Sequence, residues 1–281
     1  MSERDEAGLE DRAVDAPGLD GRDVDWDAVA DSIRAFLRER RADAGADGYV
    51  LGVSGGIDSA LAAVLAAAAV GPENVTGMVL PGAPSNAAHM RDARELIDDL
   101  GIGYREADIQ PLVEQYRRAL PGDLDRLTVG NLRARTRMVL LYEQANAANE
   151  LVIGPDNRSE YLLGYFTKYG DGAADVCPLG DLYKTEVYAL AEHVGLDERF
   201  LEKTPTAELW EGQTDEGEIG ASYAVVDAVL RRVIDRGQSV EEVAAETDVD
   251  REVVADLVEM HRASEHKRQR PPTPGLRLGA D

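Results

Sequence analysis

The sequence has few of the residues on which crosslinks, membrane spans and zinc sites depend. Its 281 residues include one cysteine, Cys177, and four lysines. A single cysteine excludes an intrachain disulfide and any zinc site built from several cysteines. No apolar run reaches the roughly 18–20 residues that a membrane-spanning helix needs. The N-terminus also lacks the basic and apolar regions of a signal peptide. We therefore expect a soluble, cytoplasmic protein.

Positive charge is scarce as well. Lys and Arg number 30 against 54 Asp and Glu, which gives a formal net charge of −24. Such a surface repels nucleic acid and anionic membranes, so neither is expected as a partner. At about 1 M salt the Debye length falls to roughly 3 Å, and most self-repulsion is screened. The acidic, lysine-poor composition therefore favours a high-salt cytosol, as in halophiles, over an ordinary acidic protein. Unfolding measured against KCl separates the two.

The pattern of apolar residues predicts one main domain. Residues 1–25 are acidic with few large apolar side chains, which predicts a disordered tail. The domain covers 26–271, and 272–281 form a C-terminal tail. Strands are predicted at 49–53, 75–80, 103–107 and 150–154, with helices at 26–37, 58–70, 86–100, 109–118 and 129–148, and later helices within 184–195, 220–236 and 239–263. This alternation predicts an α/β, Rossmann-like fold: a doubly wound parallel sheet with helices on both faces.

A glycine-rich octet lies between the first predicted strand and its helix. It reads Gly52-Val53-Ser54-Gly55-Gly56-Ile57-Asp58-Ser59. Two glycines let backbone N–H groups approach an anion, and a helix N-terminus adds a favourable partial charge. Asp58 beside phosphates requires a bridging cation such as Mg²⁺. The alternative is a plain strand-to-helix turn, but the strand–loop–helix context favours phosphate binding. Ligands of parallel sheets lie at the carboxyl ends of the strands, where this loop begins.

The octet resembles the pyrophosphate-binding loop of the ATP pyrophosphatase superfamily. That resemblance implies an adenine nucleotide alpha hydrolase-like fold and cleavage of ATP to AMP and pyrophosphate. Other parts of the chain resemble NAD synthetases, in the order of that family: 131–138, 157–160, 164–173, 205–210, 213–216 and 265–268. The resemblance covers about 26–271. It implies ATP-dependent amidation of deamido-NAD with ammonia through an acyl-adenylate, the final step of NAD biosynthesis.

The resemblance also implies roles for individual residues. ATP is bound by 52–59 with Lys184 and Thr206, and Asp58 and Glu160 hold Mg²⁺. Asp58, Lys184 and Asp175 are implied in catalysis. The residues implied for deamido-NAD are Arg135, Lys168, Asp175, His266 and Lys267. A homodimer is implied as well. Another amidating or thiolating ATP pyrophosphatase, and a nucleotide sensor without turnover, stay open as alternatives.

The scarcity of cysteine bears on the nitrogen donor. Glutamine-using members of the family carry an extra amidase domain with a nucleophilic cysteine, and 281 residues leave no room for one. Cys177 has no catalytic partner near it in sequence, so packing in the core is its expected role. We therefore expect free ammonia as the substrate.

The scarce lysines and one arginine-rich helix add two hypotheses. All four lysines fall inside or beside the family-like blocks, so Lys203 joins the candidates for a task that needs a compact ammonium. A Lys203→Arg enzyme with unchanged kinetics would remove it. On the helix at 129–148, Arg133 and Arg137 share a face while Arg135 points elsewhere. The alternative for all three is a solvated helix face. Pro155 departs from the family, which has threonine there, so a contact to nucleotide is lost.

Overall fold

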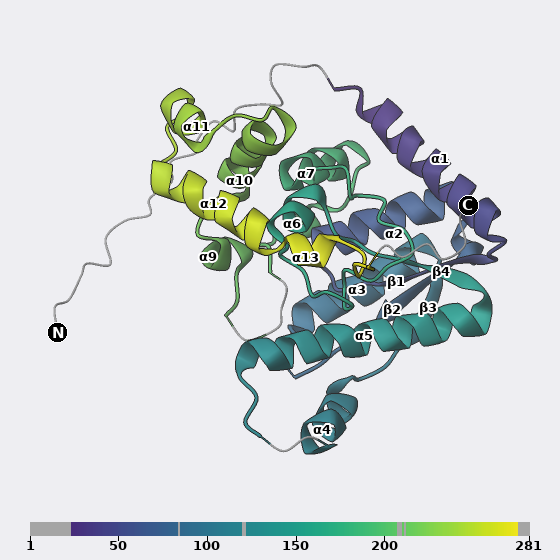
Figure 1. Cartoon of the computed structure of the whole chain (residues 1–281). Coiled ribbons are helices and arrows are strands. Elements are labelled where there is room, and N and C mark those ends of the chain that lie inside the picture. Colours follow the sequence, from purple (N-terminus) through teal and green to yellow (C-terminus); the bar gives the residue numbers. More distant parts are fainter. Residues whose placement is uncertain (1–23, 84, 120–121, 207–209, 211, 275–281) are drawn as a thin grey trace, which may run out of the picture.

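The fold is built on a parallel sheet that has four strands in the part of the chain that is described (Figure 1). The computed structural model describes residues 24–83, 85–119, 122–206, 210 and 212–274. The strands are β1 Gly48–Gly52, β2 Val75–Val79, β3 Gly103–Glu106 and β4 Glu150–Ile153. Their order is β3-β2-β1-β4, and neighbouring strands are parallel throughout. The loop after β1 therefore leaves the interior of the sheet.

Helices connect and cover the strands. The first group is α1 Trp26–Ala44, α2 Ile57–Val70, α3 Ala87–Leu100, α4 Gln110–Ala119, α5 Arg126–Ala148 and α6 Arg158–Leu163. The second is α7 Lys184–His193, α8 Glu198–Leu201, α9 Asp215–Ile219, α10 Tyr223–Leu230, α11 Val240–Glu246, α12 Arg251–Ala263 and α13 Glu265–Arg268. A 3-10 helix at Pro72–Asn74 precedes β2, and a π-helix at Arg231–Asp235 extends α10.

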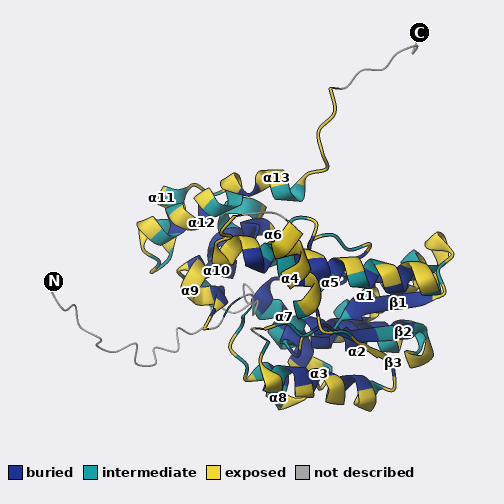
Figure 2. Cartoon of the chain, turned by 90° about the horizontal axis from the view of Figure 1, so that it is seen from below, coloured by how far each residue is buried: buried dark blue, intermediate teal, exposed yellow. Residues whose placement is uncertain are grey.

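Both faces of the sheet are covered at the interior strand β1, which explains its continuous apolar run, whereas the residues of the edge strand β3 are exposed. Leu51 of β1 packs with Leu61 of α2 and Leu190 of α7 on one face. Its neighbour Val50 packs with Leu141 of α5 on the other. Adjacent residues of a strand point to opposite faces, so a strand covered twice must be apolar at every position. Figure 2 shows β1 and β2 buried between helices with exposed outer sides.

A third apolar cluster lies beside the sheet and is made entirely of helices. α6, α10, α11 and α12 contribute buried residues to it, among them Leu163, Val229, Val243 and Leu257. In Figure 1 these helices gather to one side of the sheet. This helical lobe carries α9 and α10, whose side chains reach the end of the sheet.

The predicted parallel α/β fold is confirmed, with four strands at the expected places. The helix predicted at 239–263 is wrong as one element, because the chain breaks into α11 and α12. Asp250 accepts a hydrogen bond from the Glu252 N–H and caps α12, so the helix restarts there. The predicted tails lie mostly outside the described residues. No helix among the described residues is long and apolar enough to cross a membrane.

Candidate active site

A cavity of about 540 Å³ opens at the carboxyl end of the sheet. Its wall combines the loop after β1, the ends of β2 and β4, one side of α5, and parts of the helical lobe. Met78, Leu80 and Met138 are among the apolar residues of the lining, which also contains charged side chains such as Asp58 and Lys184. This is the position at which parallel sheets bind ligands, and the mixed lining suits a ligand with a flat apolar group and a charged group.

The predicted phosphate loop is held rigidly at the start of α2. Every member of 52–59 except Gly55 lines the cavity. Gly55 has a φ of 82°, and a Cβ at that position would lie 2.2 Å from the carbonyl oxygen of His89. The hydroxyls of Ser54 and Ser59 are 3.1 Å apart, and Ser59 Oγ also accepts the Ser54 N–H at 3.2 Å. The loop and the N-terminus of α2 are therefore preorganised for an anion.

Asp58, Glu160 and Lys184 meet at one wall of the cavity. Lys184 Nζ lies 2.5 Å from Asp58 Oδ2 and 3.2 Å from Glu160 Oε1. Asn157 donates to the other oxygen of Asp58 at 3.0 Å. The three charged residues come from α2, α6 and α7, so only the fold brings them together. The sequence-based grouping of these residues agrees with this geometry.

The cluster holds more negative than positive charge. Tyr223 of α10 donates to Asp215 at 3.1 Å and to Glu160 at 3.4 Å, so a third carboxylate lies beside the ammonium of Lys184. Burial, together with the charges of Asp58 and Asp215, raises the pKa of Glu160 to about 7, although Lys184 opposes the shift. The pKa of Lys184 is raised because attraction to Asp58 and Glu160 outweighs its burial. One ammonium cannot neutralise three carboxylates, so the cluster favours an additional cation.

The buried carboxylate of Asp227, in the helical lobe, holds the two segments that carry Glu160 and Lys184. Asp227 of α10 accepts a hydrogen bond from Ser159 Oγ at 2.5 Å and from the Thr185 N–H at 2.8 Å. Ser159 Oγ in turn accepts the Lys184 N–H at 2.9 Å. Ser159 precedes Glu160, and Thr185 follows Lys184. Asp227 therefore fixes the backbone of both segments that supply the charged residues.

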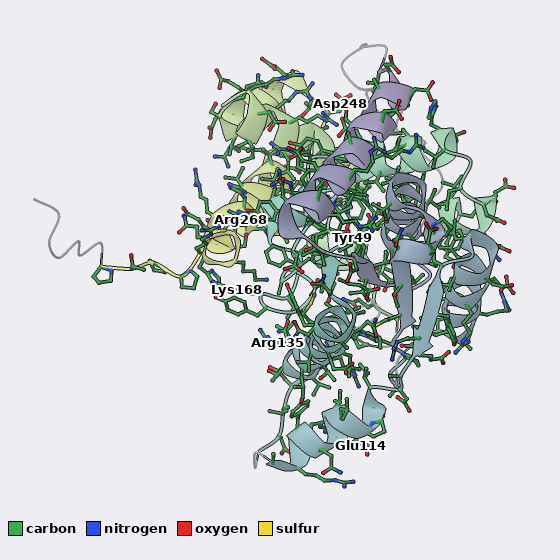
Figure 3. All side chains as sticks on the ribbon, turned by 90° about the vertical axis from the view of Figure 1, so that its right-hand side faces the viewer. Tyr49, Glu114, Arg135, Lys168, Asp248 and Arg268 are labelled. Carbon is green, nitrogen blue, oxygen red and sulfur yellow. The ribbon has the colours of Figure 1, made fainter. Side chains whose placement is uncertain are left out.

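The residues predicted for deamido-NAD do not all reach the cavity. Arg135 of α5 donates through Nε and Nη2 to the carbonyl oxygen of Lys168, each at 3.2 Å. Lys168 Nζ donates to the carbonyl oxygen of His266. Arg135 and Lys168 lie side by side along one flank of the molecule, with Arg268 beyond them (Figure 3). Arg135, Lys168 and His266, all three predicted to bind deamido-NAD, form a cluster that we call the outer group. None of them lines the cavity.

Lys267 and Asp175 lie in different surroundings. Lys267 lines the cavity, but its Nζ already donates to the carbonyl oxygens of Gly164 and Phe166, at 2.7 and 3.0 Å. Asp175 is exposed and absent from the lining, and its carboxylate accepts the Val152 N–H at 2.8 Å. The structure therefore gives both residues local contacts, and their roles toward substrate stay predictions. Thr206 lines the cavity, whereas 207–209 of the same block lie outside the described residues.

Sequence reasoning missed several side chains of the cavity. His89 of α3 lines it. Asp171 and Asp215 line it too, and burial raises the pKa of each carboxyl. Arg137 reaches the lining and donates to the carbonyl oxygen of Leu80 at 3.0 Å. Spacing already placed Arg137 on a different face from Arg135, and that signal was available in the sequence.

Cys177 was expected to pack in the core, and this prediction is wrong because the residue as a whole is exposed. Its sulfur nevertheless turns inward, and a Cβ at Gly154 would lie 3.2 Å from it. Burial of the sulfur, with the charge of Asp156, raises the thiol pKa to about 12. A thiol with that pKa is a poor nucleophile at neutral pH.

Comparison with known proteins gives matches along almost all of the chain. The family model described as NAD synthase matches residues 29–271. The NH(3)-dependent NAD(+) synthetase of Thermococcus kodakarensis is 46% identical over 253 residues, covering 90% of this chain and 99% of that protein. The protein of the same name from Halobacterium salinarum is 44% identical over 245 residues, covering 87% and 91%. The structure of NMN synthetase from Francisella tularensis superposes with a TM-score of 0.81 at 35% identity, covering 90% and 100%.

Proposed function

The chain belongs to the NAD synthase family, and on that premise we propose that its cavity is where ATP, deamido-NAD and ammonia react to give NAD, AMP and pyrophosphate. The activity is the ATP-dependent amidation that completes NAD biosynthesis, so the enzyme is a ligase that forms a C–N bond. One observation carries the assignment to this cavity. The preorganised phosphate loop faces Asp58, Glu160 and Lys184 at the carboxyl end of a parallel sheet.

In the first half of the reaction a carboxylate oxygen of deamido-NAD attacks the α-phosphorus of ATP. A bond from that oxygen to phosphorus forms, the bond to the bridging oxygen breaks, and pyrophosphate leaves. Both reactants are anions, so positive groups must be fixed at the point of attack. Backbone N–H groups of 52–59 bind the polyphosphate, and the Lys184 ammonium stabilises the charge on the leaving group. Thr206, which also lines the cavity, supplies a hydroxyl contact to ATP in this proposal.

A divalent cation fits the pair Asp58 and Glu160. Both carboxylates bind the same ammonium, so their oxygens face one point in space. Among the described residues no ready-made group of three or more metal ligands is present. Two carboxylates completed by phosphate oxygens and water suit Mg²⁺, which is commonly held this way beside nucleotides. A bound Mg²⁺ would neutralise phosphate charge during the transfer.

In the second half ammonia attacks the carbonyl carbon of the acyl-adenylate, and AMP leaves. Ammonia arrives in neutral solution mostly as ammonium, so a proton must be removed before the nitrogen is nucleophilic. Asp171 and Asp215 are carboxylates in the cavity wall whose pKa burial raises, which suits them to accept that proton. The resemblance to NAD synthetases implies a catalytic role for Asp175, which would act from outside the cavity lining.

We also propose a homodimer, because Arg135 and His266 of the outer group, both implied for deamido-NAD, are exposed in the single chain. Arg135 and Val139 are four residues apart and so share a face of α5, and Val139 is 57% exposed. Leu112 and Tyr116 of the neighbouring α4 are exposed as well. Exposed apolar side chains of this kind support an interface. A second copy seated there would cover the outer group and complete a binding site for deamido-NAD.

Light scattering on the purified protein tests the homodimer. The mass should be twice that of the chain in molar KCl, and Val139→Asp should give monomers with a raised KM for deamido-NAD and little change in folding. Glu259→Asp, on the distant α12, is the control. A monomeric wild type with full activity would refute the interface.

One assay separates the proposed function from its alternatives. Purified protein is incubated with ATP, Mg²⁺, ammonia and deamido-NAD in KCl, and NAD, AMP and pyrophosphate are quantified. Equal amounts of the three products are expected. The deamido form of NMN is run in parallel, because a structurally similar protein is named NMN synthetase. Preference for that mononucleotide would correct the substrate. AMP formation only with another acceptor would indicate another ATP pyrophosphatase, and ATP binding without any product would indicate a sensor.

A further inference from the structure

Lys203 lies in the site, but the proposed reaction assigns it no role. It follows α8, and its Nζ lies 2.7 Å from the carbonyl oxygen of Gly55 and 2.6 Å from Oδ2 of Asp92. Gly55 belongs to the phosphate loop and Asp92 to α3. The ring of Phe200 lies 4.8 Å from the same ammonium. One cation thus joins three segments that are distant in sequence.

The contact is well shielded from water. The side chains of Lys203 and Asp92 are 16% and 7% exposed. Burial alone would raise the pKa of Asp92, but hydrogen bonds from Lys203 and Arg91 outweigh it, and the pKa is lowered. Asp92 therefore stays ionised and holds the ammonium beneath the loop. A shielded, charge-assisted bond of this kind is stronger than an exposed ion pair.

The bond to Gly55 fixes the direction of a peptide plane. The C=O and N–H of one peptide group point in opposite directions, so a carbonyl held by Lys203 sets the direction of the Gly56 N–H. Gly56 lines the cavity, and its N–H points to Ser54 Oγ at 3.3 Å. Glycine on both sides of this peptide makes rotation inexpensive. A rotated peptide would turn the Gly55 oxygen toward the cavity, where it would repel phosphate.

We propose that Lys203, held in place by Asp92, is a positioning residue that keeps the Gly55–Gly56 peptide in the orientation that binds the polyphosphate of ATP. Lys203 also lines the cavity, but its ammonium is bonded to Gly55 and Asp92, so in this proposal it acts through the loop. The inference rests on the ATP-binding role proposed for residues 52–59. It also gives a structural reason for a lysine at this position in a chain that has four.

Lys203→Met tests the proposal, because methionine keeps the length of the apolar stem and removes the ammonium. The KM for ATP, and its Kd from calorimetry without turnover, should rise about tenfold or more, the size expected for loss of a charge-assisted hydrogen bond. The KM for deamido-NAD should change less than about twofold. Equal increases for both substrates, or no change in the Kd for ATP, would overturn the proposal.

A second variant separates positioning from destabilisation, since Lys203→Met leaves Asp92 buried without its partner. In Lys203→Met/Asp92→Asn the buried charge is gone, so the melting temperature should recover toward that of wild type. The Kd for ATP should stay raised. Recovery of both would show that the ATP defect came from the unpaired carboxylate, and would refute the positioning role.

Arg199→Met is the matched control. Arg199 also joins α8 to α3, through Glu95 and Asp99, but makes no contact with the loop. It should lower the melting temperature slightly and leave the Kd for ATP unchanged, and an equal ATP defect in this variant would refute the proposal. Calorimetric binding of ATP keeps this test apart from the proposed function. A wild type that binds ATP but makes no NAD would refute the reaction, and Lys203→Met would still decide the role of Lys203.

Discussion

Replacing Lys184 by methionine would leave Asp58 and Glu160 facing each other without the cation between them. Lys184 is 2% exposed, and its Nζ is hydrogen-bonded to both carboxylates. Removing one partner of a buried ion pair costs about 3–5 kcal/mol, because the remaining charge stays in a poorly solvated place. We therefore expect Lys184→Met to lower the free energy of unfolding by about 3–5 kcal/mol at pH 8 in EDTA.

The loss should depend on pH in a direction that the pKa of Glu160 sets. Burial and neighbouring carboxylates raise this pKa from 4.5 to about 7, so the folded protein binds the proton more tightly than the unfolded chain. The resulting destabilisation is absent below about 4.5 and complete above about 7. Without Lys184 the pKa of Glu160 rises further. The difference in stability between wild type and Lys184→Met should therefore be large at pH 8 and shrink toward pH 5.

Magnesium should restore part of the loss. A divalent cation can take the place of the ammonium, and a ligand at a hundred times its Kd stabilises a protein by about 2.7 kcal/mol. Urea unfolding in KCl, with EDTA or with Mg²⁺, measures both effects. Arg251→Met is the control, since its ion pair with Glu241 is exposed and contributes little to stability. A Lys184→Met protein as stable as wild type at pH 8, or one indifferent to Mg²⁺, would refute the reasoning.

Three further predictions concern the backbone around the site and the charge of the chain. Asp227→Asn should cost about 2 kcal/mol of unfolding free energy and lower kcat, because an amide cannot accept from both Ser159 and Thr185; urea unfolding and initial rates measure this. Gly55→Ala should abolish ATP binding by calorimetry, since its Cβ would lie 2.2 Å from the His89 carbonyl oxygen. The KM for ATP and deamido-NAD should fall as KCl rises toward about 1 M, because salt screens repulsion between these polyanions and a chain of net charge −24. Initial rates at several KCl concentrations would show the opposite trend if local charge alone governed binding.

The sheet and the phosphate loop could be predicted because their signals are local. Apolar runs such as 49–53 mark strands buried on both faces, and the octet after the first of them carries its own chemistry. The short helices α6, α8, α9 and α13 were missed because four to six residues give no readable period. Asn157, Asp197 and Thr214 cap α6, α8 and α9 locally, but helices this short depend on tertiary packing for their stability.

Contacts between distant segments could not be predicted from residue types. Nothing in the sequence indicates that Asp92 of α3 lies under Gly55, or that Asp227 binds Ser159. The resemblance assigned Asp175 to the substrate, but in the structure its carboxylate binds the backbone at Val152. Polar residues find partners only after the helices pack, and those partners depend on tertiary distances that no local pattern encodes.

The hydrogen bonds of Lys267 to Gly164 and Phe166 have a consequence for the folding of this enzyme during translation. The cavity is lined by residues that run from the first strand to Lys267, so its wall is assembled from early and late parts of translation. The sheet through β4 can form while the helical lobe is still being synthesised, because domains fold from the N-terminus as the chain emerges. A nascent chain therefore contains the phosphate loop long before the rest of the cavity wall has been synthesised. The cavity wall within one chain is complete only after Lys267 has been synthesised.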